Sequence, residues 1–434
     1  MRGSPAIRRV LSLFLGVCAA TAVPTAGAAP ALDLNAYYAA ALKRSETVAI
    51  QGELVRQAQE KIRQAKAAVR PTIKGFAGYT WQQAPNVASS LPGALGYQPV
   101  SGLNLSQPLF SGFREFAALR QTKDLVGAQR DDYRNARRLL FNDVVQNFYT
   151  VLSLEQDLAN LQEEIHQNEL RAKDLRARVR IGRSRSSELL TVQTAISTLR
   201  AEVQQLRGQL RVARETFAFL SGMDANTPLQ DSESLPGAVD GLDAYLAATE
   251  SRADIQAAHQ RLKAAQENVK VARGAYLPTL DLNGNYYTQR AGYLKDVTWD
   301  VQLTLSIPIY SGGGLRSATR DAISQRTQAE LSLSQARRSA QQEIRSLHDS
   351  AGFDLQQLQA LKTATEAARR NYDAQKKDYR LGLVTNLDVL QALTSYQENQ
   401  RALDRARFTA KIDWMKLQAA SDRLPILAGD GTAP

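Results

Sequence analysis

The sequence predicts a mainly α-helical fold built from two copies of one unit, in which long antiparallel coiled-coil helices join the strands of a membrane β-barrel. The first observation is a repeat, because Gly182 and Gly382 lie 200 residues apart in a chain of 434. LNLSQPLFSGF begins at Leu103 and LTLSIPIYSGG at Leu303, and the same distance separates each from an Arg-Ile-Gly or Arg-Leu-Gly sequence. The other two observations are long proline-free stretches and four stretches with alternating apolar and polar residues. The shared motifs are the non-helical ones, so the chain is a duplication rather than a chance match between helices.

The repeat also sets the expected domain boundaries. AAVRPTI at 67–73 matches GAYLPTL at 274–280, and each copy reads as helix, strand hairpin, very long helix, tip and helix. Copies of this size are too large for solenoid units, which repeat every 20 to 50 residues or so. We expect a signal peptide at 1–28, a first copy at 29–222 with its strand hairpin at 71–108, a connector rich in Pro, Ser, Gly and Asp at 223–241, a second copy at 242–423 with its strand hairpin at 278–308, and a flexible tail at 424–434.

The first 28 residues have the pattern of a signal peptide. Three arginines precede an apolar run from Val10 to Val23, and Ala26-Gly27-Ala28 supplies small residues where a signal peptidase cleaves. This pattern predicts an exported chain that begins at Ala29. No later stretch approaches the roughly 20 consecutive apolar residues of a membrane helix.

Cysteine usage and charge narrow the function classes. The only cysteine is Cys18, inside the predicted signal peptide, so the exported chain would have no thiol for a disulfide or for cysteine chemistry. Lipidation of Cys18 is a second interpretation, although Val17 is larger than the residue that usually precedes a lipidated cysteine. Loss of the leader removes three arginines and no acid, which lowers the formal net charge from +11 to +8. Because these charges are spread along helical faces, they favour a solvated surface or contact with anionic lipid, and we expect no nucleic-acid partner.

The helices are expected to be much longer than those of a globular protein. From Gly112 to Gly182 and from Gly312 to Gly382 the chain contains no proline, and at 1.5 Å per residue such a helix is a rod of roughly 100 Å. Apolar positions recur every seven residues on the first rod and again beyond its tip, which predicts an antiparallel helical hairpin. This seam comprises Val151, Leu154, Leu158, Leu161, Ile165, Asn168, Ala172, Leu175 and Val179, followed by Val192, Ile196, Leu199, Val203, Leu206 and Leu210. In the second copy a weaker seam comprises Leu358, Leu361, Ala368, Tyr372 and Tyr379.

Each copy also contains two strand-like stretches with one apolar and one polar face. Strands of about 10 residues with this alternation suit an outer-membrane barrel, with lipid on one side and water on the other. The residues expected to face lipid are Leu103, Leu105, Leu280, Leu282, Trp299, Val301, Leu303 and Leu305. Tyr79, Trp81, Tyr286 and Trp299 lie toward the hairpin tips, and Phe110 and Tyr310 lie at the opposite end, as in two interfacial aromatic girdles. A small soluble sheet with a half-buried face is the alternative.

Four strands cannot close a barrel. Open edges in lipid would leave backbone groups without hydrogen bonds, so closure has to come from other chains. Two chains would give eight strands around a lumen filled with side chains, whereas three give twelve strands and room for a channel. A homotrimer is therefore the simplest arrangement for a pore.

With these features the chain resembles the TolC-like outer-membrane efflux proteins. The resemblance covers nearly all of the exported sequence and is carried by the duplication, the strand hairpins, PLFSGF and PIYSGG at the starts of the long helices, and the glycine tips. It implies a homotrimer in the outer membrane of a Gram-negative bacterium, with a twelve-stranded barrel and an α-helical tunnel across the periplasm. It also implies work with a periplasmic adaptor (membrane fusion protein) and an inner-membrane RND or ABC transporter. The role implied is the exit duct of a tripartite efflux pump for small molecules, or alternatively the outer-membrane component of a type I protein secretion system.

The resemblance further implies a gate near the helix tips, where the tunnel is shut at its periplasmic end. Tyr379 and Asp388 fit the family pattern, but Val384 stands in place of an arginine and Gln391 in place of a second acid. In the first copy, Ser187 and Glu188 occupy the places of a hydroxyl residue and an acid. The alternative to a gate role is that Glu188 and Asp388 only stabilise the starts of the helices that follow the tips.

Two arginines of the first tip offer a replacement for the missing positive charge. Arg183 and Arg185 could bind Glu188 or Asp388 of a neighbouring hairpin, and the alternatives are solvated side chains or docking contacts. The tips are also where the family's adaptors are thought to dock. The candidate docking residues are Gly182, Arg183, Arg185, Gly382, Leu383 and Val384.

Other functions find less support. His166, His259 and His348 lack metal-ligand spacing, and no catalytic triad, phosphate loop or paired-carboxylate context is present, so neither an enzyme nor a cofactor is expected. A structural or adhesive coiled-coil surface protein is the main rival. Such a protein would more often carry one terminal membrane anchor, whereas here the strand hairpins are internal. A periplasmic adaptor would not need lipid-facing strands.

Overall fold

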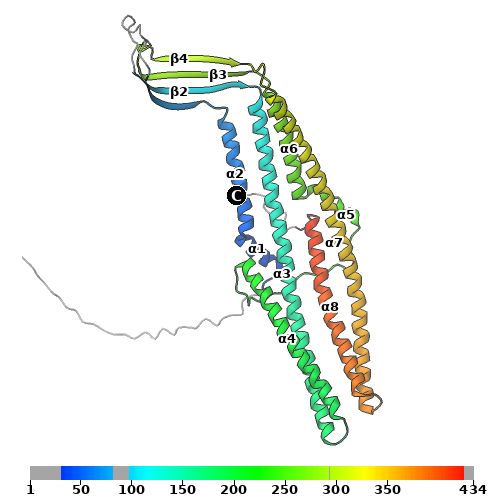
Figure 1. Cartoon of the computed structure of the whole chain (residues 1–434). Coiled ribbons are helices and arrows are strands. Elements are labelled where there is room, and N and C mark those ends of the chain that lie inside the picture. The colour runs from blue at the N-terminus through cyan, green and yellow to red at the C-terminus, as the bar shows by residue number, and fades with distance from the viewer. Residues whose placement is uncertain (1–30, 82–96, 293, 425–434) are drawn as a thin grey trace, which may run out of the picture.

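The computed structural model describes residues 31–81, 97–292 and 294–424. The predicted signal peptide with Cys18, and all but the first residue of the predicted tail, lie outside this part. The chain is an elongated molecule with a sheet at one end and helical tips at the other (Figure 1). Its elements are α1 (Leu34–Arg44), α2 (Glu46–Ala67), β1 (Thr72–Trp81), β2 (Tyr97–Ser111), α3 (Arg114–Arg180), α4 (Ser186–Ser221), α5 (Leu242–Leu246), η1 (Thr249–Ser251), α6 (Ala253–Gly274), β3 (Thr279–Arg290), β4 (Trp299–Ser306), α7 (Gly314–Leu381) and α8 (Asn386–Ala420).

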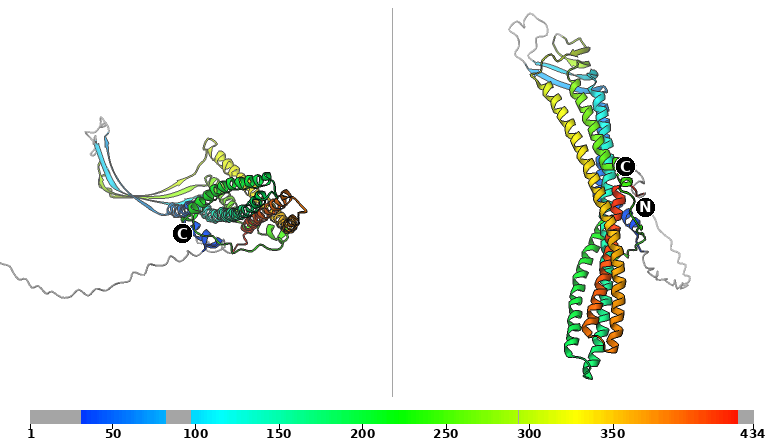
Figure 2. Two further views of the ribbon diagram at one scale, coloured as in Figure 1. Left: turned by 90° about the horizontal axis from the view of Figure 1, so that it is seen from below. Right: turned by 90° about the vertical axis from the view of Figure 1, so that its right-hand side faces the viewer.

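Two very long helices form the frame of the molecule. α3 has 67 residues and α7 has 68, so each is close to 100 Å long. Near the sheet, α2 and α6 pack on α3, and α6 also packs on α7; near the tips, α4 and α8 pack on α3, and α8 also packs on α7. The body is therefore a row of helices in both halves, with α7 at one flank and α2 or α4 at the other (Figures 1 and 2). None of the described helices combines the length and apolar character needed to cross a membrane.

The predicted heptad seam holds the first helical hairpin, α3 with α4, together. Leu161 on α3 packs with Leu199, Val203 and Leu206 on α4, and a second cluster nearer the tip includes Leu175. The seam of the second hairpin, α7 with α8, contains more polar contacts. Its predicted residues are half-buried, Thr365 is buried among them, and Tyr372 stacks on Tyr396 with ring centroids 6.4 Å apart.

Two buried tyrosines brace the long helices at mid-length and reflect the duplication. Tyr37 on α1 packs 4.7 Å from the Phe217 ring and donates a hydrogen bond of 2.8 Å to Asn147 Oδ1 on α3. Tyr245 on α5 is fully buried with Ile344 of α7 in the corresponding place of the second copy. The two tyrosines end similar tripeptides, Asn35-Ala36-Tyr37 and Asp243-Ala244-Tyr245, which therefore mark equivalent braces in the two copies.

The four strands form one antiparallel sheet in the order β1, β2, β3, β4, so β1 and β4 are its edges. The sheet is a curved strip beside the helical body (Figure 2). Two successive left-handed residues turn each copy from sheet to helix, Gly112 and Phe113 (φ 69° and 62°) and then Gly312 and Gly313 (φ 61° and 84°). Such angles favour glycine, which accounts for Gly112, Gly312 and Gly313, whereas Phe113 adopts the left-handed conformation without being glycine.

The two repeated strand motifs end differently, which corrects the predicted hairpin bounds. β2 runs on to Ser111, past the predicted end at 108, whereas β4 stops at Ser306, before the predicted end at 308. The end of β2 pairs with β3, through Phe110 with Leu280, whereas β4 is an edge strand with only β3 beside it. Pro308 has no N–H for a further ladder bond, and β4, which lacks a second neighbour, ends two residues before it.

Candidate functional site

The sheet separates its apolar and polar side chains onto two faces. Directly opposite residues of antiparallel strands share a face, and the register aligns Gly75, Leu103, Tyr286 and Trp299 across all four strands. The same face carries every predicted lipid-facing residue. Leu103, Leu105, Trp299, Val301, Leu303 and Leu305 are 40–64 % exposed, and Leu280 and Leu282 are half-buried between neighbouring strands.

The opposite face of the sheet is hydrogen-bonded and polar. Asn104 Nδ2 donates to Asn285 Oδ1 at 2.8 Å, and Asn285 Nδ2 donates to Asp300 Oδ1 at 2.9 Å. Lys74 pairs with Asn104 in the register and extends this polar row to the β1 edge. A sheet with one bare apolar face and one wet face is what a membrane barrel wall requires.

Both helical tips end in the same backbone motif. At the second tip, the Gly382 N–H donates to the Tyr379 carbonyl and the Leu383 N–H to the Asp378 carbonyl; at the first, Gly182 and Arg183 make the corresponding bonds. This is the Schellman ending, which needs a left-handed residue, and Gly182 and Gly382 have φ of 70° and 75°. Leu381 and Leu383 are 73 % and 71 % exposed, so the second tip presents an apolar surface.

Tyr379, a predicted gate residue, lies between two arginines of the first helical hairpin. The guanidinium carbons of Arg171 and Arg178 lie 5.1 Å and 4.9 Å from the centroid of the Tyr379 ring. Arg171 also donates from Nε to Asn386 Oδ1 at 2.6 Å and from Nη2 to the Asn386 carbonyl at 3.4 Å. Burial lowers the pKa of Arg171 from its usual value, yet an arginine stays charged. We name Arg171, Arg178, Tyr379 and Asn386 the arginine clamp, and it connects α3 to both ends of the second tip.

The other predicted gate residues do not join this clamp. Asp388 accepts hydrogen bonds from the Thr385 N–H at 2.7 Å and from Thr385 Oγ1 at 2.6 Å, in a capping box at the start of α8. These bonds hold the pKa of the Asp388 carboxyl below its usual range. Glu188 accepts from Ser184 Oγ at 2.8 Å, while Ser187 and Gln391 are exposed. In the described chain, no ion pair joins Arg183 or Arg185 to Glu188 or Asp388.

Sequence reasoning missed three of the four clamp residues. Arg171 and Arg178 are seven residues apart on α3, which places them on one face, but Asn386 is 215 residues from Arg171 along the chain. The seven-residue spacing of Arg171 and Arg178 beside the heptad seam was the sequence signal that could have indicated a shared contact. Val384, which stands where the family has an arginine, is half-buried.

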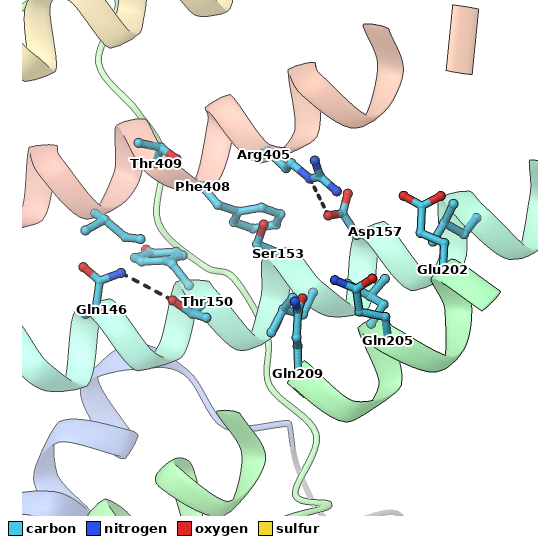
Figure 3. Close-up of a pocket in the computed structure, with 15 residues that line it drawn as sticks. Gln146, Thr150, Ser153, Asp157, Glu202, Gln205, Gln209, Arg405, Phe408 and Thr409 are labelled. Atoms are coloured by element: carbon cyan, nitrogen blue, oxygen red, sulfur yellow. Dashed lines mark hydrogen bonds and ion pairs between the residues drawn. The ribbon is translucent and has the colours of Figure 1, made fainter. Parts of the chain in front are cut away.

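A polar groove of about 490 Å³ lies farther from the tips, where α4 and α8 separate over α3 (Figure 3). Two of its lining residues, Asp157 on α3 and Arg405 on α8, form an ion pair with 2.5 Å between Oδ2 and Nε. Burial raises the pKa of the Asp157 carboxyl, and Arg405 opposes that shift. Throughout residues 31–81, 97–292 and 294–424, no group of three His, Cys, Asp or Glu side chains is placed to hold a metal ion.

Comparison with known proteins agrees with this geometry. The family described as "Outer membrane efflux protein" matches residues 37–223 and 244–421. The chain is 26% identical over 381 residues to the outer membrane efflux protein BepC of Brucella suis biovar 1 (strain 1330), covering 85% of this chain and 81% of BepC. It is 24% identical over 389 residues to the outer membrane protein TolC of Escherichia coli (strain K12), covering 83% of this chain and 76% of TolC.

Two solved structures share the fold. A membrane protein from Pseudomonas aeruginosa superposes with a TM-score of 0.81 at 20% identity, covering 92% of each chain. The outer membrane protein VceC from Vibrio cholerae superposes with a TM-score of 0.78 at 19% identity, covering 89% of this chain and 95% of VceC. The predicted fold class and outer-membrane location are confirmed. Together with the family match, they establish that this chain belongs to the outer membrane efflux protein family.

Proposed function

We propose that the protein is a trimeric channel-tunnel that serves as the exit duct of a tripartite efflux pump, passing small molecules from the periplasm to the exterior. The observation that carries the proposal is a four-stranded sheet with two open edges, one apolar face and one polar face, joined to rods of 67 and 68 residues. Three copies supply twelve strands, which leaves a water-filled lumen.

The helical body supports the same closure. The flank formed by α4 exposes Val212 (68 %) and Phe219 (70 %), and the flank formed by α7 exposes Leu331 (67 %) and Phe353 (69 %). Large apolar side chains at both ends of a helical row would be covered if α4 of one copy packed on α7 of the next. The tunnel would then extend the barrel lumen for the length of the rods.

The proposed partners are a periplasmic adaptor and an inner-membrane RND or ABC transporter. Three proteins of Pseudomonas putida that are similar to this chain are named for the efflux of antibiotics, the efflux of toluene and the export of pyoverdine. These compounds differ widely, which supports a duct whose cargo is chosen by the inner-membrane pump. The proposed adaptor-docking surface comprises the exposed tip residues Gly182, Arg183, Arg185, Gly382 and Leu383, together with the half-buried Val384.

We place the periplasmic gate at the tips, with the arginine clamp as its principal latch. Each cation–π contact is worth about 0.5–2 kcal/mol, so the two arginines on Tyr379 can hold the second tip against the first hairpin. Ser187, Glu188, Asp388 and Gln391 line the same end and remain candidate contacts to neighbouring chains.

Planar-bilayer recording of the purified protein, with its mass measured in detergent, tests the proposal. We expect three chains per particle and single channels of low closed-state conductance. The double variant Arg171→Ala, Arg178→Ala should raise that conductance, whereas Arg183→Ala, Arg185→Ala should leave it unchanged. A monomer without channels would refute the duct, and channels whose conductance responds only to the second pair would move the latch to Arg183 and Arg185.

A further inference from the structure

The two helical hairpins meet along a polar seam. Inside the first hairpin the contact is made by leucine and valine. Between α3 and α8 there are apolar contacts, such as Tyr149 with Phe408, but several charged and amide side chains also face each other. The pairs along this seam are Asp157 with Arg405 (2.5 Å), Asn160 with Asp404 (2.8 Å) and Arg171 with Asn386 (2.6 Å). A seam built from such pairs depends on the charge state of its members.

Glu164 lies in the middle of this seam without a partner. Glu164 is only 5% exposed, and its Oε2 atom is buried and makes no hydrogen bond. Two buried amide oxygens near it in the helical register, Asn168 Oδ1 on α3 and Gln397 Oε1 on α8, also lack a donor. None of these three oxygen atoms receives a hydrogen bond, and a protonated Glu164 carboxyl would supply a donor for one of the two amide oxygens.

The charged groups around Glu164 do not neutralise it. Arg401 and Glu398 face it from α8, and Glu202 faces it from α4. Arg401 already binds Glu202, with 2.9 Å between Nη1 and Oε1, so its single charge serves two acids. Burial is the main cause that raises the pKa of Glu164 to about 7, Arg401 opposes the shift, and the two other glutamates add to it.

We propose that Glu164 is a proton-binding site that fastens the second helical hairpin to the first. The protonated carboxyl donates to an amide oxygen in the seam, and α8 stays against α3. Loss of the proton leaves a buried carboxylate without a donor, which is relieved when α8 moves away from α3 and water enters. The inference rests on the proposed function, since separation of these hairpins would widen the periplasmic end of the tunnel.

The sign of the effect follows from the direction of the pKa shift. A carboxyl whose folded pKa is raised binds more protons in the closed seam than in a solvated one, so the closed seam is favoured at low pH and weakened as pH rises toward 7. The charged fraction of a group that titrates near pH 7 rises about tenfold between pH 6 and pH 8. We therefore expect open probability to rise about two- to tenfold over that interval.

The test is single-channel recording of the full chain in planar bilayers at pH 6 and pH 8. Wild type should open more at pH 8, and Glu164→Gln, which stays neutral and carries an amide donor, should remain closed at both values. Glu163→Gln is the matched control, because Glu163 is adjacent and exposed. It should behave as wild type. A Glu164→Gln channel that keeps the wild-type pH response, or a wild type with none, would overturn the proposal.

A measurement without substitutions covers the case in which Glu164→Gln does not fold. Amide hydrogen exchange of the wild-type protein, corrected for the intrinsic effect of pH, should show less protection of α8 around Gln397 and Arg401 at pH 8 than at pH 6. Equal protection would contradict the seam mechanism. Absence of channels at every pH would instead count against the duct itself, so the two failures are distinguishable.

Discussion

Asp388 has two candidate roles, in the gate and in the cap of α8, and its contacts favour the cap. Both of its hydrogen bonds go to Thr385, three residues away. We expect Thr385→Ala and Asp388→Asn to lower the melting temperature by a similar few degrees, since each opens the capping box. Ser184→Ala, at the first tip, removes a bond to Glu188 that caps nothing and serves as the control. Ion selectivity measured from reversal potentials should not change. A selectivity change at unaltered stability would give Asp388 the gate role.

A pair of aspartates between α7 and α8 predicts how the stability of the second helical hairpin depends on pH. Asp354 on α7 and Asp413 on α8 face each other, and burial together with Asp413 raises the pKa of Asp354 to about 6. A raised acid pKa means that stability present at low pH is lost as pH rises from about 4 to about 6. Asp354→Asn should therefore raise the melting temperature at pH 8 and have little effect at pH 4. Asp373→Asn, at an exposed position of α7, is the control. Equal shifts at both pH values would contradict the carboxyl pair.

The arginine clamp shows which residue roles the sequence could predict. The glycine of each tip was identified from the repeat, because its spacing within the motif is fixed, and the gate role of Tyr379 was predicted from the family resemblance. Arg171 and Asn386 could not be paired in advance, since the contact depends on how α3 and α8 are rotated and staggered against each other. A heptad pattern gives the apolar seam of each hairpin but does not set the alignment between hairpins.

Successive residues of a strand lie on opposite faces of the sheet, so two neighbouring positions of β4 give a matched pair of substitutions. Leu303 is 60 % exposed on the apolar face, and the next residue, Thr304, lies on the polar face. We expect Leu303→Arg to disfavour membrane insertion by roughly 2–4 kcal/mol if the position is near the bilayer midplane. Thr304→Arg should insert normally, because its side chain would enter water. The amount of each variant recovered in isolated outer membranes measures this, and equal recovery would reject the lipid-facing assignment.

Alternation along the sequence was sufficient to assign both faces of all four strands, but not their ends. The motifs at Leu103 and Leu303 are alike, yet β2 continues to Ser111 and β4 ends at Ser306. The difference comes from pairing, since β2 has a neighbour on each side and β4 has one. Strand length in this fold is thus decided partly by which chain segment lies alongside, which a repeat of the sequence does not encode.

The exposed flanks of the whole molecule give the last prediction, which concerns assembly. Phe219 projects from α4 and Phe353 from α7, and each is about 70 % exposed in a single chain. If α4 of one copy packs on α7 of the next, Phe219→Asp buries a carboxylate in each of three interfaces, and such a charge without a partner is strongly disfavoured. The variant should lose the three-chain mass in detergent, measured by light scattering, while its helical content is kept. Gln162→Asp adds the same charge at an exposed position of α3 and should stay trimeric. If Phe219→Asp also remains trimeric, these flanks do not meet, and the open edges of the sheet alone must hold the three copies together.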